Sequence, residues 1–124
     1  MRENIGKFRG KRVDNGEWVY GFYVKFAGSC LIYEQDDENR DYLGNFIVDP
    51  ETVGEFTGLQ DSNGKEIYEG DICKVRLNSE KPDAIGVIVF TRGCYYWNEY
   101  FLYEVIHELE VINNIHDNPE LLEK

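Results

Sequence analysis

The chain has 124 residues, close to the commonest size of one domain, so we expect a single domain over residues 1–124. It is 42% hydrophobic and 30% charged, which is the balance of a globular protein and excludes a disordered chain. No apolar run approaches the roughly 18 residues of a membrane helix. Residues 1–8 lack the apolar core of a secretory signal, so we expect a cytoplasmic protein with no membrane contact.

The formal net charge of −11 is distributed unevenly along the chain. Residues 1–12 carry five lysines and arginines against one glutamate, whereas residues 95–124 carry seven carboxylates against one lysine. We expect these two ends to attract each other, within one molecule or across a dimer. The alternative is that the basic end contacts nucleic acid.

Two Asn-Gly pairs indicate hairpins. Asn15-Gly16 and Asn63-Gly64 are each flanked by apolar segments, and Asn-Gly tolerates the positive φ angles of a type I′ turn. The second pair also fits a longer loop over residues 61–64. Residues 19–26 are almost all apolar or aromatic, which predicts a central strand covered on both faces.

The rest of the chain alternates short apolar segments with turn residues every eight to twelve positions. This spacing predicts a mainly β fold, a small curved, barrel-like sheet of short antiparallel strands. We expect further strands at residues 30–33, 46–48, 53–56, 71–77, 84–91 and 111–115. Residues 95–105 fit either a strand pair or a short helix. Asn118-Pro119 predicts an N-cap and a short C-terminal helix over residues 119–123.

Few side chains suggest catalysis or metal binding. Cys30, Cys73 and Cys94 form no CxxC pair, so we predict reduced thiols, no zinc site and no cofactor. His107 and His116 share no ligand spacing with them. The acidic segment 36–41 lacks the glycine and the last glutamate of a calcium loop, which favours a solvated loop. We therefore expect a protein that is not an enzyme.

The N-terminal hairpin offers a candidate interaction surface instead. Basic and aromatic residues alternate over residues 7–20, a mixture that can stack on bases and follow a phosphate backbone. The same aromatic side chains also fit a hydrophobic core. The surface that we predict consists of Arg9, Lys11, Arg12 and Trp18.

Three segments resemble the YopX-like proteins of phages and prophages. They are FRGKRVDNGEWVYG from Phe8, VGEFTGLQDSNGKEIYEGDI from Val53 and VINNIHDNPELL from Val111. They occur in the family's order and reach across nearly the whole chain. One departure is residue 113, where the resemblance leads us to expect glycine and the chain has asparagine.

The resemblance implies a compact β-rich fold and a phage-borne or prophage-borne gene. It brings no catalytic residues and no cofactor. We therefore expect a non-catalytic accessory protein that binds a host or phage protein, with homo-oligomers as one form. The alternatives are a nucleic-acid module using residues 7–20 and an acidic mimic of DNA.

Overall fold

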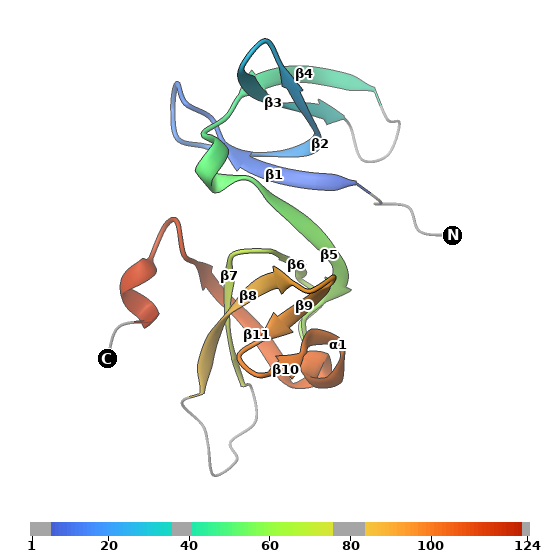
Figure 1. Cartoon of the computed structure of the whole chain (residues 1–124), viewed down its shortest axis with the longest axis vertical. Helices are drawn as coiled ribbons and strands as arrows, with labels where there is room; N and C mark the ends of the chain where they lie inside the picture. Colours follow the sequence, from blue (N-terminus) through green and yellow to red (C-terminus); the bar gives the residue numbers. More distant parts are fainter. Residues whose placement is uncertain (1–5, 36–40, 76–83, 123–124) are drawn as a thin grey trace. The chain divides into compact units, whose positions relative to one another are not determined.

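The computed structural model describes residues 6–35, 41–75 and 84–122. The fold is mainly β, as predicted, with one six-stranded and one five-stranded antiparallel sheet in the part of the chain that is described (Figure 1). The chain divides into two compact units, Met1–Phe56 and Thr57–Lys124. Each unit is described by itself below, and one domain over residues 1–124 stays a prediction.

The N-terminal unit is an antiparallel sheet in the order β4-β3-β2-β1-β5. Its elements are β1 (Lys7–Lys11), β2 (Trp18–Phe26), β3 (Ser29–Gln35), β4 (Tyr42–Ile47), the 3-10 turn η1 (Pro50–Thr52) and the start of β5 (Gly54–Gln60). Strands β1 to β4 follow one another as a meander, and β5 returns to pair with the free edge of β1 at Phe8 and Arg9.

The core of this unit lies on one face of the sheet. Its buried members are Val19, Cys30, Ile32 and Val48. Tyr20, Tyr33 and Ile47, each next to one of them in the chain, are exposed on the opposite face. The sheet curves until the chain after β4 meets the end of β1. Arg12 forms an isolated antiparallel β-bridge with Val48, and the Asp49 amide donates to the Lys11 carbonyl at 2.8 Å. This contact makes the sheet barrel-like, but the described strands do not form a closed barrel.

Both expected hairpins are present, but their turns are not type I′. The Asn15-Gly16 pair lies in a longer loop in which the Gly16 amide donates to the Arg12 carbonyl at 2.9 Å. Of the two residues only Gly16 has a positive φ, +74°, whereas a type I′ turn requires it at both. Asn63-Gly64 lies in the longer 61–64 loop that the sequence left open.

The expectation that β2 is covered on both faces is wrong. The strand is central, between β1 and β3, but only one of its faces packs against the core. The other face is exposed, with 46% of Phe22 and 72% of Phe26 accessible. A run of apolar residues indicates a strand that is buried on two faces. Within this chain only one face of the sheet is buried.

The C-terminal unit contains the five-stranded sheet, in the order β10-β9-β8-β7-β11. It also holds the end of β5, which pairs with β6. Its elements are β6 (Glu66–Tyr68), β7 (Asp71–Val75), β8 (Ile85–Thr91), β9 (Cys94–Trp97), β10 (Tyr100–Phe101), α1 (Leu102–Val105), the 3-10 turn η2 (Ile106–Glu108), β11 (Leu109–Asn114) and the 3-10 turn η3 (Pro119–Leu122).

Residues 95–105, for which the sequence fits either a strand pair or a short helix, belong to this unit. The segment contains both alternatives, because the strand pair β9 and β10 leads directly into the short helix α1 (Figure 1). Leu102 and Ile106 from this helical stretch join Ile67, Ile88 and other buried side chains in the core. The helix expected after Pro119 forms as the turn η3.

Two further expectations concern the solvated loop and the absence of a membrane helix, and both can be compared only with the described residues. The segment expected to be a solvated loop, 36–41, lies outside them except for Asp41, which is exposed. Among the described residues, no helix is long and apolar enough to cross a membrane.

Candidate interaction surface

Three of the four predicted surface residues form one cluster on the β1–β2 hairpin. Arg9, Lys11 and Trp18 share a face, because Lys11 pairs directly with Trp18 and Arg9 lies two positions before Lys11. The Arg9 Cζ lies 4.7 Å from the centre of the Trp18 ring, and the Lys11 Nζ lies 5.6 Å from it. Both distances are within the range of cation–π contacts. We call these three residues the hairpin cluster.

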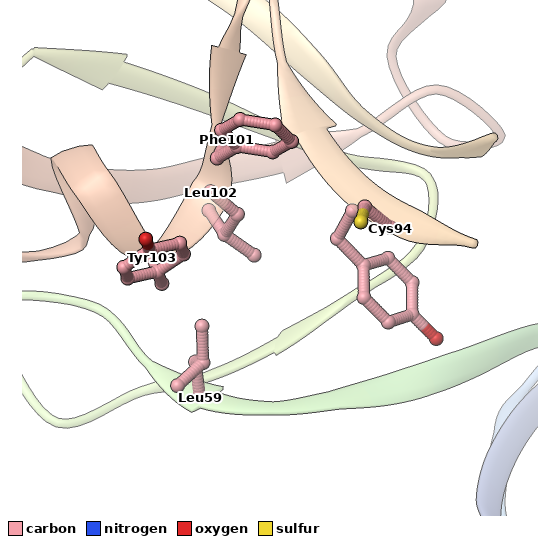
Figure 2. A pocket seen from close by; sticks show the side chains of 6 residues that line it. Leu59, Cys94, Phe101, Leu102 and Tyr103 are labelled. Carbon is pink, nitrogen blue, oxygen red and sulfur yellow. The ribbon is translucent and has the colours of Figure 1, made fainter. Parts of the chain in front are cut away.

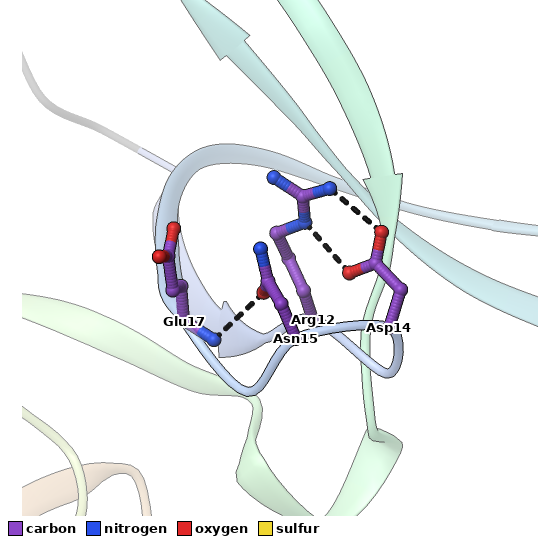
Figure 3. A network of polar contacts seen from close by, with 4 residues as sticks. All are labelled: Arg12, Asp14, Asn15 and Glu17. Atoms are coloured by element: carbon purple, nitrogen blue, oxygen red, sulfur yellow. Dashed lines mark hydrogen bonds and ion pairs between the residues drawn. The ribbon is translucent and has the colours of Figure 1, made fainter.

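The fourth residue, Arg12, points to the opposite side of the hairpin. Its Nε and Nη2 donate to the two carboxylate oxygens of Asp14 at 2.9 and 2.7 Å (Figure 3). This paired hydrogen bond raises the pKa of Arg12 and lowers the pKa of Asp14. The Arg12 Cζ also lies 4.2 Å from the centre of the Phe46 ring. Arg12 therefore fastens the turn and does not extend the hairpin cluster.

Because of these contacts, fewer charged groups of the predicted surface are accessible to an external ligand. Arg9 is only 6% exposed, and its guanidinium is placed over an indole ring. The Arg12 charge is balanced by Asp14 beside it. The hairpin cluster thus forms a border of engaged cations beside the outer face of β2, β3 and β4.

A larger exposed feature lies beside this border, on the face of β2, β3 and β4 opposite the core. Alternate residues of the three strands point there. Two of them are polar, Ser29 opposite Phe26 and Asn45 opposite Tyr33, and the apolar ones form what we call the apolar sheet face. Its members are Tyr20, Phe22, Val24, Phe26, Leu31, Tyr33 and Ile47. All except the half-buried Leu31 are more than a third exposed.

The strand register arranges these side chains in rows. Phe22 pairs with Tyr33 on β3, and Val24 pairs with Leu31, which in turn pairs with Ile47 on β4. Directly paired residues have Cβ atoms about 5 Å apart, so the side chains of a row are in reach of each other. The apolar sheet face therefore crosses all three strands at the row of Val24, Leu31 and Ile47, whereas the row of Phe22 and Tyr33 ends at Asn45 on β4.

No charged residue lies on this face within the described parts of β2, β3 and β4. The charged residues of these strands, Lys25 and Glu34, have the opposite parity and point to the other side. The nearest charged residues on this side are on the neighbouring strand β1, where Lys7 pairs with Phe22 and Arg9 pairs with Tyr20. The face thus has an uncharged centre and a cationic border.

The C-terminal unit has an apolar pocket of about 430 Å³. It is open and lined by Leu59 of β5, Cys94 and Tyr95 of β9, and Phe101, Leu102 and Tyr103 at the β10–α1 junction. Figure 2 shows Leu59 opposite Phe101, Leu102 and Tyr103, with Cys94 at the side. The lining offers apolar contact and almost no polar surface, which suits an apolar group.

The cysteines and histidines are placed in different environments. Cys73 is fully buried, and burial raises the pKa of its thiol far above the usual value. Cys30 is buried and its Sγ accepts a hydrogen bond from the Tyr23 hydroxyl at 3.2 Å, while Cys94 is exposed. His107 is exposed in η2. Among the described residues no three metal-ligating side chains gather at one point.

The segment that resembles the family's central hallmark has a structural role in the C-terminal unit. The Asp71 carboxylate accepts from the Tyr68 amide at 2.7 Å, and Gly70 between them has a φ of +93°. Ile67 and Ile72 are both fully buried. This turn therefore directs β6 into β7 between two fully buried isoleucines.

Comparison with known proteins decides the family. The model of the YopX protein family matches residues 7–123, almost the whole chain. The chain belongs to the YopX family. A search of the curated proteins finds no significant match.

One solved structure shows the fold of this YopX family member in another protein. The crystal structure of protein EF1440 from Enterococcus faecalis is similar with a TM-score of 0.61 and 24% sequence identity. The similarity covers 98% of this chain and 100% of EF1440. It supports the mainly β architecture described above.

The apolar sheet face is the feature that sequence reasoning missed. Its signal was present, because residues 19–26 are almost uninterrupted in apolar character. That pattern was interpreted as burial on both faces within one chain. The register shows that the alternate positions of β2 face outward together with those of β3 and β4.

Proposed function

We propose that this YopX family protein is a non-catalytic interaction module that binds another protein through the apolar sheet face. One observation carries the proposal: a continuous exposed face of β2, β3 and β4 with no charged residue in the described parts of these strands. Monomeric soluble proteins rarely expose large contiguous apolar patches, and such patches often mark protein interaction sites.

The environment of the two buried thiols supports the non-catalytic part. A cysteine nucleophile must reach the thiolate form near neutral pH. Cys73 is fully buried with a strongly raised pKa, and Cys30 is buried with its sulfur in a hydrogen bond. Both act as small apolar side chains of the cores.

The proposed setting is the cytoplasm of a bacterial host, with the gene carried by a bacteriophage or an integrated prophage. The resemblance to YopX-like proteins is its basis. The bacterial source of the similar protein EF1440 supports it.

A nucleic-acid module receives less support from the same hairpin. Phosphate contacts need accessible cations. Arg9 is buried over the Trp18 ring and Arg12 is paired with Asp14, so both arginines of the predicted surface are engaged within the chain. The acidic mimic of DNA stays a prediction, because part of its acidic segment lies outside the described residues.

The test places one charge in the apolar sheet face. Val24→Glu changes a residue that is 38% exposed on β2, and Val89→Glu changes a residue that is 40% exposed on β8 of the other unit. The wild type and both variants are immobilised and exposed to host lysate and to an untagged copy of the chain. Retained proteins are quantified by mass spectrometry.

We expect at least one protein to be retained by the wild type and by Val89→Glu, and to be reduced more than tenfold on Val24→Glu. The physical reason is that an unpaired carboxylate buried in an apolar contact is not compensated. Equal retention by Val24→Glu and the wild type would contradict the proposed function.

A further inference from the structure

We propose that the apolar sheet face is the contact between two copies of this chain, packed sheet against sheet about a two-fold axis. This inference rests on the proposed function, because it names the partner of the same face. Three properties of the face point to a second copy: its area, its lack of charge and its relief.

The area fits what a homodimer needs. Taking about 200 Å² for a fully exposed aromatic side chain and somewhat less for an aliphatic one, the exposed fractions of the face amount to roughly 500 Å² of apolar surface. A standard interface buries about 800 Å² on each partner. In homodimers about 65% of it is apolar, again roughly 500 Å².

The absence of charge matters because two copies of this chain repel each other. Each carries a formal charge of −11, so most orientations bring carboxylates of the two copies together. The apolar sheet face has no charged residue in the described parts of β2, β3 and β4. Contact through its uncharged centre brings no carboxylates of the two copies into direct opposition, which favours this orientation over others.

The face has a relief, that is, a row of smaller side chains between bulkier ones, and this shape allows one copy to pack against the other. The row of Val24, Leu31 and Ile47 is aliphatic and lies between more bulky aromatic residues on both sides. Phe22 and Tyr33 form one flank, and Phe26, 72% exposed, forms the other. In a two-fold contact each residue meets the same surface on the partner, so aromatic flanks of one copy can lie along the aliphatic row of the other. Packed sheets lie about 10 Å apart, which such side chains fill.

The hydrophobicity of β2 is explained in the same way. A strand of almost continuous apolar residues is typical of one that is buried on both faces. The core of the N-terminal unit covers the side of Val19, and a second copy would cover the side of Val24.

The experiment measures the mass of the protein in solution by sedimentation equilibrium over a range of concentrations. The wild type, Val24→Glu and Val89→Glu are compared, with Phe26→Ser as a second variant of the face because its side chain is mostly exposed and not needed for the core. Thermal unfolding followed by circular dichroism shows whether each variant is folded.

We expect the wild type and Val89→Glu to sediment with twice the mass of one chain. Val24→Glu should raise the dissociation constant at least about a hundredfold, because an unpaired buried charge is strongly destabilising and the two-fold axis places two of them in one contact. Phe26→Ser should raise it at least about tenfold. If Val24→Glu does not fold, the effect of Phe26→Ser decides.

Two results would overturn the inference, and they differ in their consequence for the proposed function. A wild type that is monomeric at about 0.5 mM, well above the concentrations at which specific dimers form, rejects the second copy. If the face still retains another protein in the capture experiment, the proposed function survives that result. A wild-type dimer that neither face variant weakens shows that the copies meet through another surface, which rejects the apolar sheet face as the dimer contact. The capture experiment with Val24→Glu then decides the proposed function by itself.

Discussion

Asp61 ties a loop to a strand that is distant in sequence. Its Oδ1 accepts from the amides of Asn63 and Lys65 at 2.8 and 2.9 Å, and its Oδ2 accepts from the amide of Val111 at 2.9 Å. Burial raises the pKa of Asp61, but the hydrogen bonds from Val111, Lys65 and Asn63 lower it by more. The net pKa therefore lies below that of an ordinary aspartate, and the charged form is stabilised in the folded state.

We predict that Asp61→Asn lowers the free energy of unfolding by about 2 kcal/mol at pH 7, because the amide nitrogen then faces the Val111 amide and the charge is lost. Chemical denaturation measures it. Asp14→Asn is the control, and it should leave stability nearly unchanged because Asp14 is exposed.

The effect of Asp61→Asn should depend on pH in one direction. A carboxylate with a lowered folded-state pKa contributes stability above its unfolded pKa of about 4, and that contribution is lost as the pH falls through the folded-state value. The gap between the wild type and Asp61→Asn should therefore narrow below pH 4. A gap that stays constant to pH 2 would contradict this assignment.

At the scale of elements, Gly21 sets how closely β2 and β3 approach. A Cβ at this position would lie 2.8 Å from the carbonyl carbon of Tyr33 and closer still to its oxygen. Both atoms belong to the backbone, so they cannot move aside as a flexible side chain would. Glycine within a strand commonly marks such a close approach in a strongly curved sheet.

We predict that Gly21→Ala lowers the free energy of unfolding by at least about 2 kcal/mol, since the added methyl group overpacks the β2–β3 contact. Gly16→Ala is the matched control, because Gly16 has open space around it and a φ of +74°. It should cost about 1 kcal/mol for the left-handed backbone alone. Thermal unfolding of the two variants compares them, and an unchanged stability of Gly21→Ala would refute the close approach.

Strands were easier to predict from the sequence than turns. The apolar segments locate β2, β3, β7, β8 and β11 because period and composition are local properties. The Asn-Gly pairs located two hairpins but not their geometry. Two-residue turns in which both residues have positive φ lie at Ala27-Gly28 and Arg92-Gly93 instead. A non-glycine residue in that conformation is held by the pairing of its strands, which no local pattern reports.

The candidate surface shows the same limit. Proximity of Arg9, Lys11 and Trp18 follows from one hairpin, and the sequence predicted it. The apolar sheet face needs three strands in register, including the Leu31–Ile47 pair between β3 and β4. A shift of one residue would have turned Val24 and its neighbours inward, so only the structure could place them.

At the scale of the whole molecule, an acidic chain presents an uncharged aromatic surface on its N-terminal unit. Net charge disfavours association of two copies in most orientations, and in the proposed dimer the copies meet through the apolar sheet face. The pocket of the C-terminal unit adds a second apolar site, lined by Leu59 and by the β10–α1 junction.

The central claim is that the apolar sheet face is covered in the assembled protein. A soluble paramagnetic probe relaxes methyl groups according to their accessibility, and two residues of β8 calibrate it. Val89 is 40% exposed and Ile88 is fully buried. Val24 and Ile47, which are 38% and 49% exposed in the single chain, should relax as little as Ile88 in a concentrated sample. Relaxation of Val24 and Ile47 as strong as that of Val89 would contradict the claim.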